Sequence, residues 1–152
     1  MKKLLFTTFI ICLATRAFCQ QAETDAVKAT INTMFDAMRK GDSVMLNKTF
    51  HKSMVLQSVA NKKDGTVALI TEKPEEFAKA VGTPHKEVWD ERITYGAIKI
   101  DGALASVWTP YKFYVDDKFS HCGVNFFQLM KTETGWKIIY IVDTRRKDNC
   151  PE

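Results

Sequence analysis

The feature that most constrains this chain is a pair of apolar runs near its C-terminal end, within residues 121–146. The first run spans residues 124–130 and the second spans 136–142, and in both runs the apolar residues occupy odd and even positions alike. A Thr-Glu-Thr-Gly segment separates them with residues that favour a turn. The second run is rich in β-branched residues, which favour strands. The stretch therefore predicts a β-hairpin inside a sheet that is covered on both faces.

Polar side chains gather at the far end of this hairpin. His121 and Asn125 are four residues apart, so they share one face of their strand. If the turn is centred on Thr134, Asn125 lies opposite Asp143, and Arg145 follows on the same face; a slip of one residue would reverse the face. The same face is then expected to carry Phe127, Leu129, Ile139 and Ile141. Apolar walls closed by a few polar groups predict a pocket for a small molecule.

Residues 1–19 have the pattern of a cleavable signal peptide. Two lysines precede an apolar run over residues 4–14, which is too short for a transmembrane span, and small residues suited to signal peptidase follow. A lipidated Cys19 is the alternative, which the bulky phenylalanine before it disfavours. We expect a single mature domain over residues 20–152 in the periplasm or outside the cell, with no stable membrane anchor.

The charge of the chain lies largely in this leader. The formal net charge is +4 at pH 7, and the leader carries three basic residues and no acidic one, so the mature domain has +1. A near-neutral domain lacks the basic footprint of a nucleic-acid-binding protein. We therefore expect no nucleic-acid partner.

The segments before the hairpin predict an α+β domain. Apolar residues recur at helical spacing over residues 22–40, and a short helix capped by Asp42 should follow, burying Val44, Met45 and Leu46. The remaining elements expected are strands over residues 54–60 and 66–71, a helix over 74–82, and strands over 88–100 and 103–115.

The long strands predict a bent sheet. Gly96, Pro110 and Gly123 fall inside them, at positions that typically mark bulges or bends. A strongly curved antiparallel sheet should then wrap around the long N-terminal helix, and two short helices complete the cone.

Five short motifs resemble one known group of proteins. They are Trp89-Asp90-Glu91-Arg92, Pro110-Tyr111-Lys112-Phe113, residues 119–125 (FSHCGVN), Gly135-Trp136-Lys137-Ile138 and Asp143-Thr144-Arg145-Arg146. With the element order, they resemble the nuclear transport factor 2-like superfamily in its SnoaL-like branch, over residues 22–150. The nearest likeness is to small exported Bacteroidetes-type proteins labelled putative lumazine-binding. The resemblance implies the cystatin-like cone but no single function, because this superfamily holds both enzymes and binding proteins.

The residues expected to line the pocket are Trp89, Trp108, Tyr111, His121, Asn125, Asp143 and Arg145. The two tryptophans could instead fill the core. Asp143 and His121 are the candidate catalytic pair, because a carboxylate at the end of an apolar wall can have a raised pKa. The alternative is a structural network in which Asp143 pairs with a neighbouring cation. No metal-ligand spacing or nucleotide-binding motif occurs, so we expect no metal and no cofactor.

Cys122 and Cys150 are the cysteines that remain after the leader is removed, in a compartment that permits disulfides. Continuing the last strand would carry Cys150 past Cys122, so a bond between them requires the tail to turn back. Asp148, Asn149 and Pro151 favour such a turn. We expect a disulfide; a buried free Cys122 is the alternative.

Three functions are compatible with these features. The first is an exported protein that binds a small apolar or aromatic molecule, and the second is a cofactor-independent acid–base enzyme of the isomerase, cyclase or dehydratase type. The third is an interaction module whose outer sheet face forms a homodimer, which is compatible with either of the others. That outer face would present Phe126, Gln128, Met130 and Tyr140.

Overall fold

The computed structural model describes residues 2–62 and 64–151, with their side chains from residue 20 onward. Its elements are α1 (Lys2–Lys40), α2 (Ser43–Asn47), β1 (Phe50–Asn61), β2 (Val67–Glu72), α3 (Pro74–Gly82), β3 (Trp89–Ile93), β4 (Ile98–Asp101), β5 (Leu104–Val115), β6 (Lys118–Thr132) and β7 (Gly135–Thr144). The leader expected over residues 1–19 thus lies outside the residues whose side chains are described. Within the described part of the chain, no helix is both long and apolar enough to cross a membrane.

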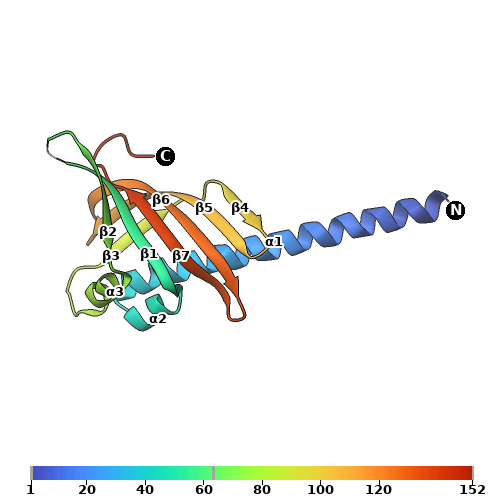
Figure 1. Ribbon diagram of the computed structural model, residues 1–152, viewed down its shortest axis with the longest axis horizontal. Helices are drawn as coiled ribbons and strands as arrows, with labels where there is room; N and C mark the ends of the chain where they lie inside the picture. The colour runs from blue at the N-terminus through green and yellow to red at the C-terminus, as the bar shows by residue number, and fades with distance from the viewer. Residues whose placement is uncertain (1, 63, 152) are drawn as a thin grey trace.

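Seven strands form one curved sheet in the order β2-β1-β7-β6-β5-β3, with β4 also paired to β5 (Figure 1). In this view α1 passes behind the sheet, and α2 and α3 lie near one end of it. The predicted α+β class is confirmed. The sheet is mixed rather than antiparallel throughout, because β1 lies beside the last strand, β7, and runs parallel to it.

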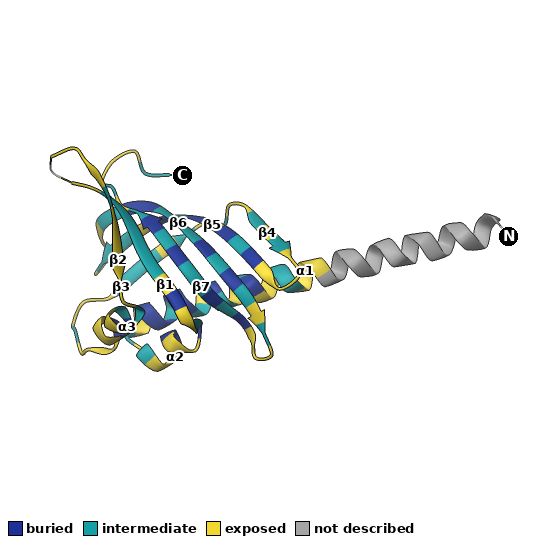
Figure 2. Ribbon diagram, in the orientation of Figure 1, coloured by how far each residue is buried: buried dark blue, intermediate teal, exposed yellow. Residues whose placement is uncertain are grey.

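The core lies between α1 and the concave face of the sheet (Figure 2). The stripe predicted on the long helix is buried: Val27, Ile31, Met34, Phe35 and Met38. A helix with one apolar stripe can bury that face and leave the rest to water, which places α1 against the sheet.

The short helix α2 begins as predicted but buries less than expected. The Asp42 carboxylate accepts a hydrogen bond from the backbone N–H of Met45 (2.8 Å), which caps the helix. Leu46 is fully buried, whereas Val44 is 65% exposed, so its predicted burial is wrong. Five residues form little more than one turn, and only one side of such a helix can face the core.

The final hairpin pairs Asn125 with Asp143, the register predicted from the turn. A bulge in β7 shifts the register between Gln128 and Leu129. Because the bulge inserts Ile139, the fully buried side chain is Ile138, and the predicted inward position of Ile139 is wrong.

Two of the predicted bend positions have a steric role. The strand expected over residues 88–100 is divided into β3 and β4, and a Cβ at Gly96 would lie 2.9 Å from the carbonyl oxygen of Trp108. A Cβ at Gly123 would clash with the carbonyl oxygen of Thr144. The bulge between β5 and β6 falls after Phe113 rather than at Pro110.

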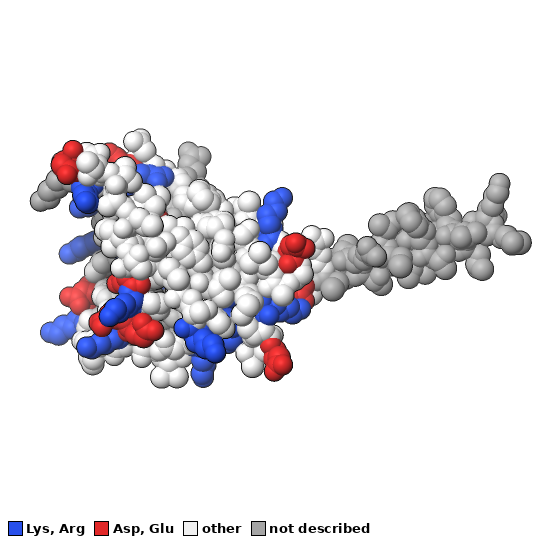
Figure 3. Space-filling model, in the orientation of Figure 1, with Lys and Arg blue, Asp and Glu red and all other residues white. Residues whose placement is uncertain are grey.

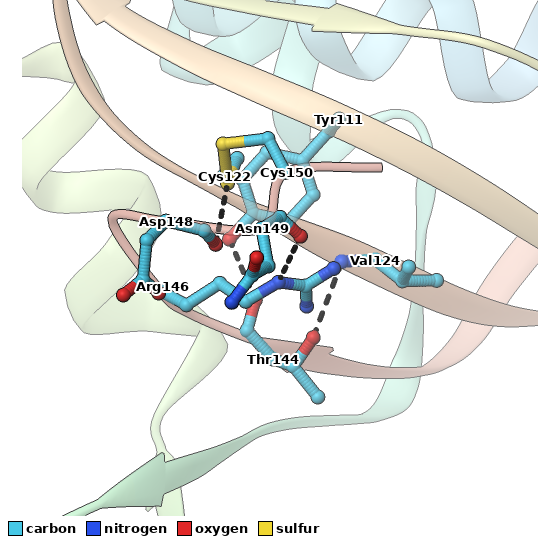
Figure 4. The surroundings of a disulfide bond; sticks show 8 residues. All are labelled: Tyr111, Cys122, Val124, Thr144, Arg146, Asp148, Asn149 and Cys150. Carbon is cyan, nitrogen blue, oxygen red and sulfur yellow. Dashed lines mark hydrogen bonds between the residues drawn. A yellow bond between two sulfur atoms is a disulfide. The ribbon is translucent and has the colours of Figure 1, made fainter. Parts of the chain in front are cut away.

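Cys122 and Cys150 form a disulfide, with 5.6 Å between their Cα atoms (Figure 4). Strand pairing ends at Arg146, whose backbone exchanges two hydrogen bonds with Cys122 (2.8 and 2.9 Å). The tail then turns back, and the Arg146 Nε donates to the carbonyl of Asn149 (2.9 Å). The C-terminal segment is therefore fixed beside the strand that carries His121 and Asn125.

Candidate ligand-binding site

A cavity of about 400 Å³ lies between the concave face of the sheet and the helices α1 and α3. Its apolar lining consists of Met34, Phe35, Met38, Leu56, Phe77, Ala80, Trp89, Phe113, Phe127 and Ile141. Its polar lining consists of Glu72, Glu91, His121, Asn125, Asp143 and Arg145. This size and this mixture of apolar walls with a few polar groups are typical of small-molecule sites.

The centre of the polar group is the pair formed by Asn125 on β6 and Asp143 on β7. The two residues face each other across the antiparallel ladder, and both are buried. The Arg145 Nε donates to Asp143 Oδ2 (2.7 Å), while the Arg145 side chain remains 51% exposed. Asp143 Oδ1 is buried without a hydrogen-bond partner among the described residues. One oxygen of this carboxylate is thus neutralised and the other is left unsatisfied.

Glu91 on β3 completes the polar group, although it was not among the residues predicted to line the pocket. The Asn125 Nδ2 donates to Glu91 Oε1 (2.7 Å), which joins β3 to β6. Burial in the apolar cavity raises the pKa of Glu91 to about 7, and the charge of Asp143 adds to this; the Asn125 bond and the charge of Arg145 act in the opposite direction. Glu91 therefore titrates near neutral pH.

His121 lies beside aromatic rings at the same end of the cavity. Its ring centroid is 5.0 Å from that of Phe113 and 5.7 Å from that of Tyr111. Burial lowers the pKa of His121, and the positive charge of Arg145 lowers it further. The imidazole is accordingly neutral at pH 7 and can either donate or accept a hydrogen bond.

The structure brings five of the seven predicted pocket residues to this cavity: Trp89, His121, Asn125, Asp143 and Arg145. Trp108 is outside it, with 49% exposure on the other face of β5, so its prediction as a wall is wrong. Alternation along β5 places Trp108 and Tyr111, three residues apart, on opposite faces.

Tyr111 faces inward but lies behind the cavity wall rather than on it. Its hydroxyl donates to the carbonyl of Thr144 (2.9 Å) and is 3.4 Å from Asp143 Oδ2. Tyr111 therefore supports the strand that carries Asp143, and its predicted place in the pocket lining is wrong.

The sequence contained one signal that could have found Glu91. Trp89 was expected to line the pocket, and Glu91 is two residues further along the same strand, on the same face. Glu72 had no such signal, because it lies at the edge of the cavity at the end of β2, a strand whose residues, Glu72 included, are mostly exposed.

The curved sheet closed by α1, with a cavity at its concave side, is the fold of solved proteins described as nuclear transport factor 2-like. Residues 22–142 match the family described as putative lumazine-binding, and the chain belongs to this family. No curated protein matches the sequence.

Solved structures share the fold at low identity. A conserved protein from Planctomyces limnophilus has a TM-score of 0.67 and 16% identity, over 83% of this chain and 98% of its own. An NTF2-like protein of unknown function from Shewanella baltica has a TM-score of 0.64 and 17% identity, over 84% of this chain and 96% of its own. A putative dehydratase of the NTF2-like family from Streptomyces avermitilis has a TM-score of 0.61 and 12% identity, over 84% of this chain and 98% of its own.

Proposed function

We propose that this protein is an exported binding protein for a small, flat, largely apolar molecule. The observation that carries the proposal is the cavity of about 400 Å³. Ten apolar residues form its walls, and the polar group around Asn125 and Asp143 lies at one end of it. Burying one face of a ring against such walls contributes roughly 25 cal/mol per Å² of apolar surface. The polar end would then fix the orientation of the ligand.

Export is the second part of this proposal. The leader pattern over residues 1–19 supports it, and so does the disulfide between Cys122 and Cys150, which an oxidising compartment would maintain. The intact mass of the protein recovered from its own exporting cells should lack the leader. A mass that includes residues 1–17 would contradict export by cleavage.

The binding proposal is tested by native mass spectrometry of the same material. We expect the wild-type protein to retain a small molecule, and Ala80→Trp to lose it, because Ala80 lines the cavity from the exposed side of α3. Lys79→Trp is the matched control, since Lys79 is its exposed neighbour and does not line the cavity. Equal retention by both variants would place the ligand elsewhere.

An acid–base enzyme is the second candidate, favoured by the Glu91 pKa of about 7. A general base works best when its pKa lies near the working pH. Glu91→Gln, His121→Gln and Asp143→Asn should then lower turnover at saturating substrate far more than they lower ligand affinity. Comparing affinity with turnover in the three variants separates an enzyme from a binding protein.

The outer face of the sheet supports a homodimer as a further part of the proposal. Trp108 and Leu104 are about half exposed there, and the Trp108 ring lies beside that of Phe126. Few charged side chains lie on this face (Figure 3). A second copy of the chain would cover this apolar surface. Sedimentation equilibrium should show a dimer that Trp108→Lys weakens; a monomeric wild type would contradict it.

A further inference from the structure

We propose that the ligand is an organic cation, an amine carried on an apolar body of about the size of a bicyclic ring. The inference rests on the proposed binding function and adds the charge of the ligand to it. The arrangement that carries it is an aromatic cavity whose polar residues are mainly hydrogen-bond acceptors.

The charges around the cavity are unequal. Three carboxylates line it, from Glu72, Glu91 and Asp143, against the single guanidinium of Arg145. That guanidinium already forms an ion pair with Asp143 (2.7 Å). His121 adds no compensating charge, because burial and Arg145 hold its pKa below the usual range. An anionic ligand would therefore meet an excess of negative charge.

The acceptors around the cavity are also incompletely used. Asp143 is only 8% exposed, and its Oδ1 has no hydrogen-bond partner in the described part of the chain. Glu91 accepts one hydrogen bond, from Asn125 to Oε1, and its second oxygen receives none from the described residues. A buried acceptor without a donor, such as Asp143 Oδ1, is costly, and a ligand that supplies N–H groups at this end would relieve part of the cost.

The walls favour the same class of ligand. Five aromatic rings line the cavity: Phe35, Phe77, Trp89, Phe113 and Phe127. The faces of aromatic rings attract cations, and this attraction strengthens where water is excluded. The rings can hold the apolar body of the ligand, while its ammonium group lies towards Glu91 and Asp143.

Three probes with the same indole ring test the inference: tryptamine, which is a cation, tryptophol, which is neutral, and indole-3-propionate, which is an anion. Isothermal titration calorimetry at pH 8 measures each affinity. We expect tryptamine to bind about tenfold more tightly than tryptophol, from one charge-assisted hydrogen bond, and indole-3-propionate to bind most weakly.

Glu91→Gln should remove most of the tryptamine advantage over tryptophol, and a cooperative urea unfolding transition at pH 8 shows that the variant is folded. Glu133→Gln, in the exposed β6–β7 turn, is the matched control and should bind as the wild type does. Tryptophol or indole-3-propionate binding as tightly as tryptamine would overturn the cation inference and leave the proposed function standing. A failure of all three probes to bind would overturn both.

Discussion

Replacing Glu91 with glutamine should stabilise the protein at pH 8 and have little effect at pH 4. Glutamine keeps the oxygen that accepts the hydrogen bond from Asn125 and removes the carboxylate that the cavity disfavours. The folded protein holds the Glu91 proton more tightly than the unfolded chain does, because the pKa rises from 4.5 to about 7 on folding. The wild type therefore loses stability as the pH rises from about 4.5 to about 7.

The size of the effect follows from that pKa. Raising it from 4.5 to about 7 corresponds to a cost of about 3 kcal/mol once both states are ionised. For a domain of this length, that free energy corresponds to a change of roughly 6–12 °C in the melting temperature.

Urea denaturation of the wild type and Glu91→Gln at pH 4, 6 and 8 measures the difference in the free energy of unfolding. It should grow with pH in favour of the variant and level off above pH 7. Glu133→Gln, in an exposed turn, should show no such growth. A difference that does not depend on pH would refute the idea that the cavity disfavours the ionised form of Glu91.

Two further predictions concern the frame around the cavity. Trp136→Ala should lower the free energy of unfolding by about 3–5 kcal/mol, since Trp136 is buried and its Nε1 donates to Glu23 on α1 (3.0 Å). Trp108→Ala, at a half-exposed position, should lower it far less. Equal losses in the two variants would contradict the assigned strand faces. Reducing the Cys122–Cys150 disulfide should lower the free energy of unfolding by roughly 3–4 kcal/mol, because the disulfide closes a loop between residues 28 apart. Urea midpoints that do not change on adding reductant would contradict this.

Much of the fold could be predicted because the patterns are local. The spacing on the first helix was sufficient to place α1. A turn centred on Thr134 predicted the pairing of Asn125 with Asp143, but the observed turn pairs Thr132 with Gly135, and the predicted pair forms because the bulge at Ile139 shifts the register. The parallel pairing of β1 with β7 could not be predicted in this way, since it joins strands from opposite ends of the domain and no local pattern specifies it.

The candidate site was predictable on β6 and β7 and poorly predictable elsewhere. Asn125 and Asp143 followed from the register of one hairpin, whereas the contact of Asn125 with Glu91 depends on how far the sheet curves. Trp108 and Tyr111 could not both line the pocket, because strand alternation places them on opposite faces of β5.

The central claim is that the cavity binds a small molecule, and methyl NMR of the protein titrated with tryptophol tests it most directly. The methyl signals of Met38, Leu56 and Ile141, which line the cavity, should shift together as the probe is added. Those of Leu69 and Leu104, which are exposed and outside the cavity, should stay in place. Shifts confined to the exposed methyls, or the absence of any shift up to millimolar tryptophol, would contradict the account.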